Sequence, residues 1–255
     1  MEVTSATMEK WYGKNAKPIR QIDSGMVVDY GCGAGKGVFT VYEIFSGVWI
    51  GFMDFDTPET IAASSGGNDQ LFQVTYCLRG RFECEFPDRR CVCIGEGDVA
   101  VNGTRYIPVS FSFPLNVFYG IGVIIDRRAV SGGFGPILSA FSIDLEAIYK
   151  TLRLDSRWYT EKADPRISRV FAELYTAGER GDLSYLGLKT VELLYCIGLL
   201  TGEGSRGCEF CSGAQVRKVK RIRDQLLEQA DTRPALERVV EKHNMRKKNT
   251  VLEHF

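Results

Sequence analysis

The sequence predicts an α+β protein in which strands come first and helices follow. Up to about residue 126, short runs of β-branched and aromatic residues are separated by Gly, Pro, Asn and Asp, which is typical of an all-β segment. From about residue 135 the spacing of apolar residues lengthens from two to nearly four, which indicates helices. The 255 residues are 44% hydrophobic and 25% charged, so the chain can bury a sizeable core.

The front half should form a barrel or a sandwich, because its many short strands are separated by regular turns. We expect strands over residues 38–45, 48–53, 72–78, 82–86, 91–94, 99–101 and 117–125. Arg79–Gly80 separates the third of these from the fourth, which alternates apolar and charged residues up to a turn at Pro87–Asp88. This pattern predicts a hairpin with one face in water.

The rear half should contain helices that pack on one another. An apolar helical face is predicted over residues 143–152, and Asp164–Pro165 is a typical cap and first-turn pair for the next helix. Residues 182–200 carry an apolar stripe wide enough to serve a core and a subunit interface together. Residues 202–213 are rich in Gly, Ser and Cys, so we interpret them as a linker.

Beyond the linker the charge changes sign. Residues 213–255 contain eleven Lys and Arg against six Asp and Glu, a net +5, which leaves −5 on the preceding residues because the total is zero. A first helix there would carry a basic face formed by Arg217, Lys218, Lys220, Arg221 and Arg223. Two short helices are then predicted over residues 234–243 and 247–255, on either side of a tight turn. This arrangement has the form of a helix-turn-helix.

The composition gives little support to metal or thiol chemistry. The only histidines are His243 and His254, so most of the chain lacks an imidazole for a nucleophile pair or a metal site. Eight cysteines in a chain of this length are expected to be reduced thiols. Cys208 and Cys211 have redox or half-zinc spacing, and we interpret them as stray thiols, with a redox sensor as the alternative. We therefore predict no catalytic residue, no metal and no cofactor.

A glycine-rich segment points to a different class of protein. Residues 27–35 are similar to the first motif of S-adenosylmethionine-dependent methyltransferases, and Asp54 lies near the distance of that motif's acidic partner. A helix should begin after such a loop, whereas residues 38–45 are a predicted strand. We favour a turn between two strands, and a methyltransferase is the less favoured alternative.

With these features together, the chain resembles an AraC-type transcription regulator over almost its whole length. Residues 71–86 resemble the central hairpin of that family's cupin domain, and residues 95–98 resemble the turn after it. Residues 226–227, 236–240 and 244–255 resemble the first of the family's two helix-turn-helix units. The resemblance implies an α+β chain with an N-terminal cupin-like β-barrel, central dimerisation helices and a C-terminal partial helix-turn-helix.

The sequence also departs from the family pattern. Where metal cupins have paired histidines, residues 64–70 contain none, so no metal site is implied. Arg246 occupies the usual Ser cap of the recognition helix, and the sequence ends at Phe255, before a second helix-turn-helix unit. We therefore expect the C-terminal segment to be only marginally folded.

The resemblance assigns roles to four segments: a cupin-like sensor domain (1–135), a helical dimerisation region (136–201), a linker (202–213) and a truncated helix-turn-helix domain (214–255). An unknown small-molecule effector would bind in the barrel, where Trp49 and Tyr76 are candidate lining residues. Promoter DNA would be contacted by Lys247, Lys248, Asn249 and Thr250, with Arg217, Lys220 and Arg221 on phosphates. The sequence does not decide which face of the central strand points into the barrel. The inward residues are either Phe72, Val74 and Tyr76 or Gln73, Thr75 and Cys77.

The expected protein is a cytoplasmic homodimer that is not an enzyme and does not enter a membrane. No apolar run approaches the roughly 18 residues of a membrane span, and the first residues lack a basic-then-apolar signal segment. The alternative is a sensor and dimerisation module that has lost DNA binding through truncation.

Overall fold

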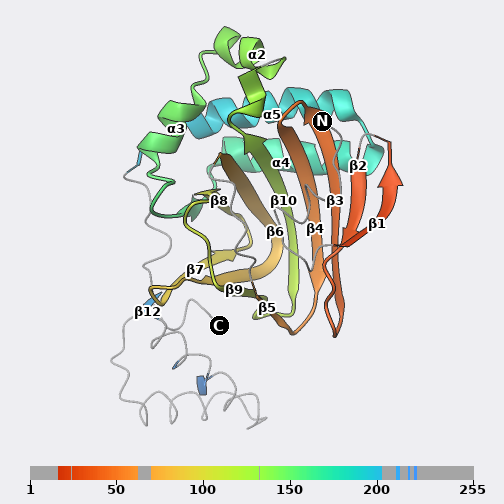
Figure 1. Ribbon diagram of the computed structural model, residues 1–255, viewed down its shortest axis with the longest axis vertical. Coiled ribbons are helices and arrows are strands. Elements are labelled where there is room, and N and C mark those ends of the chain that lie inside the picture. The colour runs from red at the N-terminus through yellow and green to blue at the C-terminus, as the bar shows by residue number, and fades with distance from the viewer. Residues whose placement is uncertain are drawn as a thin grey trace.

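The computed structural model describes residues 17–23, 25–62, 70–131, 133–202, 211–212, 218 and 221–222. Strands dominate up to Asp126 and helices dominate after it, as predicted (Figure 1). The strands are β1 (Lys17–Ile22), β2 (Gly25–Asp29), β3 (Lys36–Phe45), β4 (Val48–Asp56), β5 (Thr60–Ala62), β6 (Leu71–Glu85), β7 (Arg90–Gly95), β8 (Asp98–Gly103), β9 (Ser110–Ser112), β10 (Val117–Asp126), β11 (Tyr159–Lys162) and β12 (Cys211–Ser212). The helices are η1 (Ala129–Ser131), α2 (Phe134–Ala140), α3 (Leu145–Thr151), α4 (Pro165–Arg180) and α5 (Leu183–Gly198).

The strands form one curled antiparallel sheet, a half-barrel. The main order is β1-β2-β3-β4-β10-β6, and β8 and then β11 continue from the first half of β6. The second half of β6 pairs instead with β7 and β9, which form the lower part of the molecule in Figure 1 together with β5 and β12. The half-barrel with accompanying helices agrees with the predicted fold class, and the predicted helix-turn-helix lies outside the described residues.

The predicted break at Arg79–Gly80 is wrong, because β6 continues through it. Gly80 has φ +88°, and a Cβ at this position would lie 2.0 Å from the carbonyl oxygen of Val117. Only glycine fits there, so the strand bends and passes from one part of the sheet to the other without reversing. The chain reverses later, between β6 and β7, where the Phe86 N–H donates to the Arg90 carbonyl at 2.9 Å.

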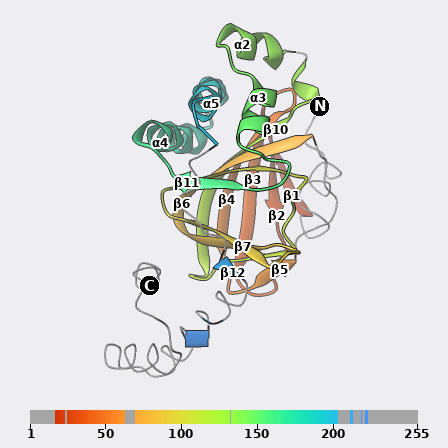
Figure 2. The same cartoon turned by 90° about the vertical axis from the view of Figure 1, so that its left-hand side faces the viewer.

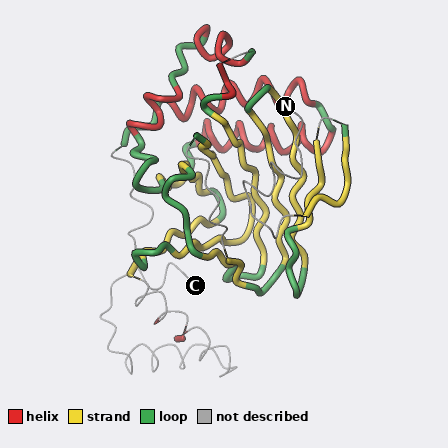
Figure 3. Tube along the Cα trace, in the orientation of Figure 1, coloured by secondary structure: helices red, strands yellow, loops and turns green. Residues whose placement is uncertain are grey.

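Two long helices cover the outer face of the sheet. Figure 2 shows α4 and α5 nearly end-on and side by side, and Figure 3 shows the helices gathered at one end of the strands. The Asp164 carboxylate accepts from the backbone N–H groups of Arg166 and Ile167 at 2.7 and 3.0 Å, and Gly181 ends α4 with a left-handed φ of +67°. The start of α4 therefore agrees with the predicted Asp164–Pro165 cap, and its end has the left-handed glycine that is common at helix C-termini.

The region predicted to be helical contains one strand that the sequence pattern did not indicate. Strand β11 lies between α3 and α4 and pairs antiparallel with β8, with Tyr159 opposite Val101 and Lys162 opposite Asp98. The Lys162 ammonium also donates to Asp98 at 3.0 Å. None of the helices that the structure describes is long and apolar enough to cross a membrane.

Candidate functional site

The inner face of the half-barrel is the face opposite α4 and α5. Strand register places its residues in three rows across the sheet, of which two run from β8 through β6, β10 and β4 to β3 and the third runs from β6 to β3. The upper row is Asn102, Gln73, Ile124, Trp49 and Glu43; the middle row is Ala100, Thr75, Gly122, Gly51 and Val41; the lower row contains Cys77, Gly120, Met53 and Phe39. Glycine residues therefore occupy the centre of this face.

Gly51 and Gly122 lie directly opposite each other at that centre. A Cβ at Gly51 would have as its nearest neighbours Val41 Cγ2 at 3.8 Å and the Gly122 carbonyl oxygen at 3.9 Å, so a methyl group would fit there in ordinary contact. A Cβ at Gly122 would lie 3.0 Å from Gln73 Nε2 and 3.3 Å from Met53 Cε, so those two side chains lean over Gly122. Glycine inside a strand weakens the strand and often marks close approach of a ligand or another backbone.

Uncharged polar groups stand beside the glycines. Thr75 and Asn102 are 7% and 6% exposed, and the Gln73 amide donates to the Thr75 hydroxyl at 2.9 Å. Among the described residues, every buried polar side chain is Thr or Asn, and none carries a charge. The charged Glu43 lies at the end of the upper row, opposite Trp49. The middle of the inner face can thus offer hydrogen bonds without a fixed charge.

The lower part of the half-barrel is filled by aromatic side chains. Phe39 and Phe55 meet edge to face at 5.2 Å between ring centroids, and Phe55 and Phe113 stack at 4.6 Å. Burial also raises the pKa of Tyr30, and burial followed by the charge of Asp98 raises the pKa of Cys77 to about 12. These groups stay protonated at neutral pH, so this part of the molecule has the character of a packed core and not of a nucleophilic site.

The structure resolves the open question about β6. Phe72, Val74 and Tyr76 face the helices, whereas Gln73, Thr75 and Cys77 belong to the inner face. Trp49 lies on the inner face and is 1% exposed. Tyr76 lies on the outer face, where its ring stacks on Phe171 of α4 at 4.7 Å. The two predicted ligand-lining residues are therefore on opposite sides of the sheet, and only Trp49 lies beside the glycine centre.

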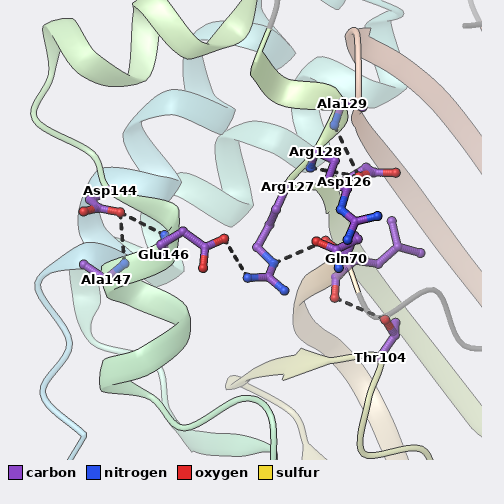
Figure 4. A network of polar contacts seen from close by, with 10 residues as sticks. Gln70, Thr104, Asp126, Arg127, Arg128, Ala129, Asp144, Glu146 and Ala147 are labelled. Carbon is purple, nitrogen blue, oxygen red and sulfur yellow. Dashed lines mark hydrogen bonds and ion pairs between the residues drawn. The ribbon is translucent and has the colours of Figure 1, made fainter.

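Arg127 joins the rim of the half-barrel to α3, and the sequence analysis did not identify it. Figure 4 shows its guanidinium between two elements: Nε donates to the Gln70 carbonyl at 3.3 Å, and Nη1 donates to the Glu146 carboxylate at 2.6 Å. The same group lies 3.9 Å from the centre of the Tyr149 ring. A single Arg in the turn after a strand gives no periodic signal, so only the fold brings these partners together.

The glycine signal, in contrast, was present in the sequence. Gly120 and Gly122 interrupt the predicted strand 117–125, and Gly51 interrupts the predicted strand 48–53. Isolated glycines in strands suggest a bulge or a close approach. These glycines do not predict a site by themselves, because a sequence does not show that two separate glycine positions meet across neighbouring strands.

The glycine-rich segment is a turn between antiparallel strands, as favoured, and it lacks the strand-loop-helix geometry that the methyltransferase alternative requires there. The segment joins β2 to β3 with no helix between them. The N–H groups of Gly33 and Ala34, which would approach a cofactor in the alternative, donate to the Glu59 carboxylate at 2.9 and 2.6 Å. No group of three or more His, Cys, Asp or Glu that could hold a metal occurs within the described part of the chain.

The predicted DNA-contacting residues fall mostly outside the described ranges. Arg221 is described and exposed. Arg217, Lys220, Lys247, Lys248, Asn249 and Thr250 lie outside the described residues, as does Cys208 of the thiol pair. Their roles stay predictions.

The predicted pairing helix α5 exposes a line of apolar side chains. Leu188, Tyr195 and Leu199 are 60%, 50% and 49% exposed, and their spacing of seven and four residues places them on one face. We call Leu188, Tyr195 and Leu199 the α5 stripe. The opposite face of α5 is buried, with Leu186, Leu193 and Leu194 all at 0% exposure.

No protein-family model matches the chain, and no curated protein matches it in sequence. Among solved structures, the AraC-like transcriptional activator CuxR is similar over 97% of this chain and 80% of its own, at 13% identity and a TM-score of 0.42. Unsaturated-fatty-acid-bound ToxT from Vibrio cholerae is similar over 82% of this chain and 78% of its own, at 10% identity and a TM-score of 0.41. An RmlC-like cupin protein from Desulfovibrio desulfuricans is similar over 35% of this chain and 82% of its own, at 14% identity and a TM-score of 0.30.

Proposed function

We propose that the chain is an AraC-type transcription regulator that binds an uncharged small molecule on its inner face and promoter DNA through its C-terminal segment. The observation that carries the sensor half is the glycine centre of Gly51 and Gly122, where the sheet carries no side chain and uncharged hydrogen-bonding groups lie beside it. Ligand sites commonly combine apolar walls with a few well-placed polar groups. Trp49 and Met53 would supply the walls, and Gln73, Thr75 and Asn102 the polar groups.

The chemical class of the ligand follows from the lack of charge on the central polar side chains of the inner face. An ion without a countercharge is strongly disfavoured where water is excluded, and the three central polar side chains are neutral amides and a hydroxyl. An uncharged ligand with both donors and acceptors is therefore the best match to the centre of the inner face.

The pairing half of the proposal is supported by the α5 stripe. Apolar side chains that are half exposed and lie in line on one helix are suited to a symmetric contact, in which the same surface of two copies meets itself. The DNA half is supported by the sequence alone, through the net +5 of residues 213–255 and the resemblance of the tail to a helix-turn-helix.

DNA binding is the decisive experiment. The full chain is used to select from random-sequence duplexes at low salt, and the enriched sequence is then titrated by fluorescence anisotropy. A regulator gives a saturable preference for the enriched sequence, and the double variant Lys247→Ala/Lys248→Ala abolishes it. The matched control is Lys150→Ala on α3, where an exposed lysine outside the tail is removed and binding is unchanged.

The salt dependence separates the two kinds of contact. Each phosphate contact that is lost lowers the slope of log affinity against log salt by about 0.9. Removal of Arg217 or Arg221 should reduce this slope and weaken all sequences alike, whereas Asn249→Ala should reduce the preference between sequences.

A sensor and pairing module without DNA binding is the second candidate function, and the sequence favours it at one point. Arg246 occupies the position of the recognition-helix cap, where Ser, Thr, Asp or Asn stabilises a helix by about 1 kcal/mol. If no sequence is enriched while the chain remains folded and forms dimers, this second function replaces the first.

A further inference from the structure

A cavity of about 160 Å³ lies between α3 and the C-terminal part of α5, remote from the inner face. Its walls are mostly apolar and include Ile148, Leu152, Leu194, Ile197 and Gly198. Ile148, Leu152, Leu194 and Ile197 are at most 5% exposed, because they also belong to the core between the helices and the sheet. The walls are therefore held in place by the fold itself.

The helix that forms one wall is fixed at both its start and its side. The Asp144 carboxylate caps α3 by accepting from the backbone N–H groups of Glu146 and Ala147 at 2.9 and 3.0 Å. Arg127 holds the same helix to the sheet through Glu146 and the Tyr149 ring, as Figure 4 shows for Glu146. A cavity with such walls exists before a ligand arrives, so little ordering free energy opposes binding.

The lining also includes polar residues, of which one is acidic. They are Asp144, whose carboxylate caps α3, and the hydroxyl-bearing Ser142, Thr151 and Tyr195. No lining residue is Lys, Arg or His. The lining therefore favours a ligand that donates hydrogen bonds or carries a positive charge, and it disfavours an anion.

The volume limits the size of the ligand. An apolar cavity of about 150 Å³ accommodates a single benzene ring. We propose that the cavity between α3 and α5 is a second ligand site, which takes a one-ring molecule bearing a hydroxyl or amine donor. The apolar ring would lie against Ile148 and Leu194, and the donor would point to the polar lining residues. This site does not depend on the proposed DNA binding or on the inner-face ligand, and it shares Tyr195 and Leu199 with the proposed pairing surface.

Three one-ring probes test the proposal on the full chain by calorimetry and ligand-observed NMR. Phenol carries a neutral donor, benzylamine is a cation at pH 7, and benzoate is an anion. We expect saturable binding of phenol and benzylamine, and at least tenfold weaker binding of benzoate. Absence of saturable phenol and benzylamine binding up to millimolar concentrations would overturn the proposal.

The variant Gly198→Leu tests whether the probes bind in the cavity between α3 and α5. A Cβ at Gly198 would lie 3.7 and 3.9 Å from Ile148 Cδ1 and Cγ1, in ordinary contact, so a leucine grows into the cavity without a clash at its base. Phenol affinity should fall at least tenfold. Ala147→Phe enlarges an exposed side chain on the opposite wall and should give the same loss if Gly198→Leu does not fold. The control Ala172→Leu introduces the same side chain at an exposed position of α4 and should leave binding unchanged.

Asp144→Asn tests the charge of the lining. Asparagine also caps helices well, so α3 is retained while the charge is removed. The preference for benzylamine over benzoate should shrink at least threefold. An unchanged preference, or equal phenol binding by wild type, Gly198→Leu and Ala147→Phe, would contradict the assignment of the site.

Discussion

The ring of Tyr76 in β6 lies parallel to that of Phe171 in α4, with 4.7 Å between centroids and 10° between planes. This stack connects the central strand to the helix that covers it, at a point where both residues are buried. Because side chains alternate along a strand, fixing Tyr76 on the outer face also fixes Gln73, Thr75 and Cys77 on the inner face. One aromatic contact thus determines which polar groups the half-barrel offers to a ligand.

Removing either ring should destabilise the fold strongly. Phe171→Ala and Tyr76→Ala should each lower the free energy of unfolding by about 3–5 kcal/mol, because a large cavity is left in the core. A double-mutant cycle in urea should give a coupling of about 0.5–1.5 kcal/mol beyond the lost area. Tyr76→Phe keeps the ring and serves as the control. A coupling near zero would show that the two rings contribute to the free energy of unfolding independently of each other.

Two glycines in the long helices should respond in opposite directions to alanine. A Cβ at Gly178 would lie 2.1 Å from Phe52 Cζ, so Gly178→Ala forces the Phe52 ring to move and should destabilise the chain. Gly198→Ala meets only ordinary contacts and should stabilise it by up to about 1 kcal/mol through helix propensity. Thermal unfolding measures both. Combining Gly178→Ala with Phe52→Ala should remove the steric part of the penalty.

Arg127→Lys should behave as a severe substitution. The lysine cannot bond the Gln70 carbonyl and the Glu146 carboxylate together and also cover the Tyr149 ring with a flat cation. We expect a loss of about 2 kcal/mol, since hydrogen bonds of charged groups contribute about 1.5–3 kcal/mol each and are only partly replaced. Glu146→Gln should cost less than about 1 kcal/mol, because the Glu146 side chain is 57% exposed. Equal effects of the two variants would contradict this account.

The cap of α4 should make stability depend on acid pH. Burial by itself raises the pKa of Asp164, but the backbone N–H groups of Ile167 and Arg166 and the Arg166 guanidinium outweigh it and lower that pKa. A lowered pKa contributes stability that is complete above the unfolded value of about 3.9 and is lost as the pH falls through the folded value. The melting temperature of wild type should therefore fall more steeply below pH 4 than that of Asp164→Asn. Parallel curves would exclude Asp164 as a source of the acid sensitivity.

Filling the glycine centre should abolish sensing and preserve the fold. Gly51→Leu adds a side chain at the glycine centre, and its Cβ would meet Val41 Cγ2 at 3.8 Å and the Gly122 carbonyl oxygen at 3.9 Å, in ordinary contact, so we expect the variant to fold. A thermal-shift screen with uncharged monosaccharides, nucleosides and amides measures binding. Compounds that stabilise wild type should lose their effect on Gly51→Leu and keep it on Gly198→Leu. Compounds that act equally on all three proteins bind elsewhere.

The sequence predicted much of the fold wherever the signal is local. The strand pair β3–β4 and both ends of α4 are encoded by neighbouring residues: a Ser46–Gly47 turn, an Asp164–Pro165 cap and a left-handed Gly181. The orientation of β6 could not be predicted, because apolar residues occupy both of its faces and the covering helix is distant in sequence. The pairing of β11 could not be predicted either, because its four residues are too few to carry a strand pattern and its partner β8 is distant in sequence.

The candidate site was predicted only in part. The fold places the predicted lining residue Trp49 beside the glycine centre. The other predicted lining residue, Tyr76, lies on the outer face, because the sequence does not show which aromatic residues meet a helix. Asn102 and Gln73 became neighbours only through the pairing of β8 with β6.

Strand β11 makes the half-barrel and the helices after it a single folding unit. It completes the edge of β8 and is followed two residues later by α4, so a fragment that ends at residue 135 would leave the β8 ladder unpaired on one side. An uncovered edge strand recruits other chains and promotes aggregation. An isolated β domain cut at the apparent boundary should therefore precipitate, whereas a fragment that extends to residue 202 should stay dispersed. Any mechanism that separates the two halves of this protein must first break that four-residue ladder.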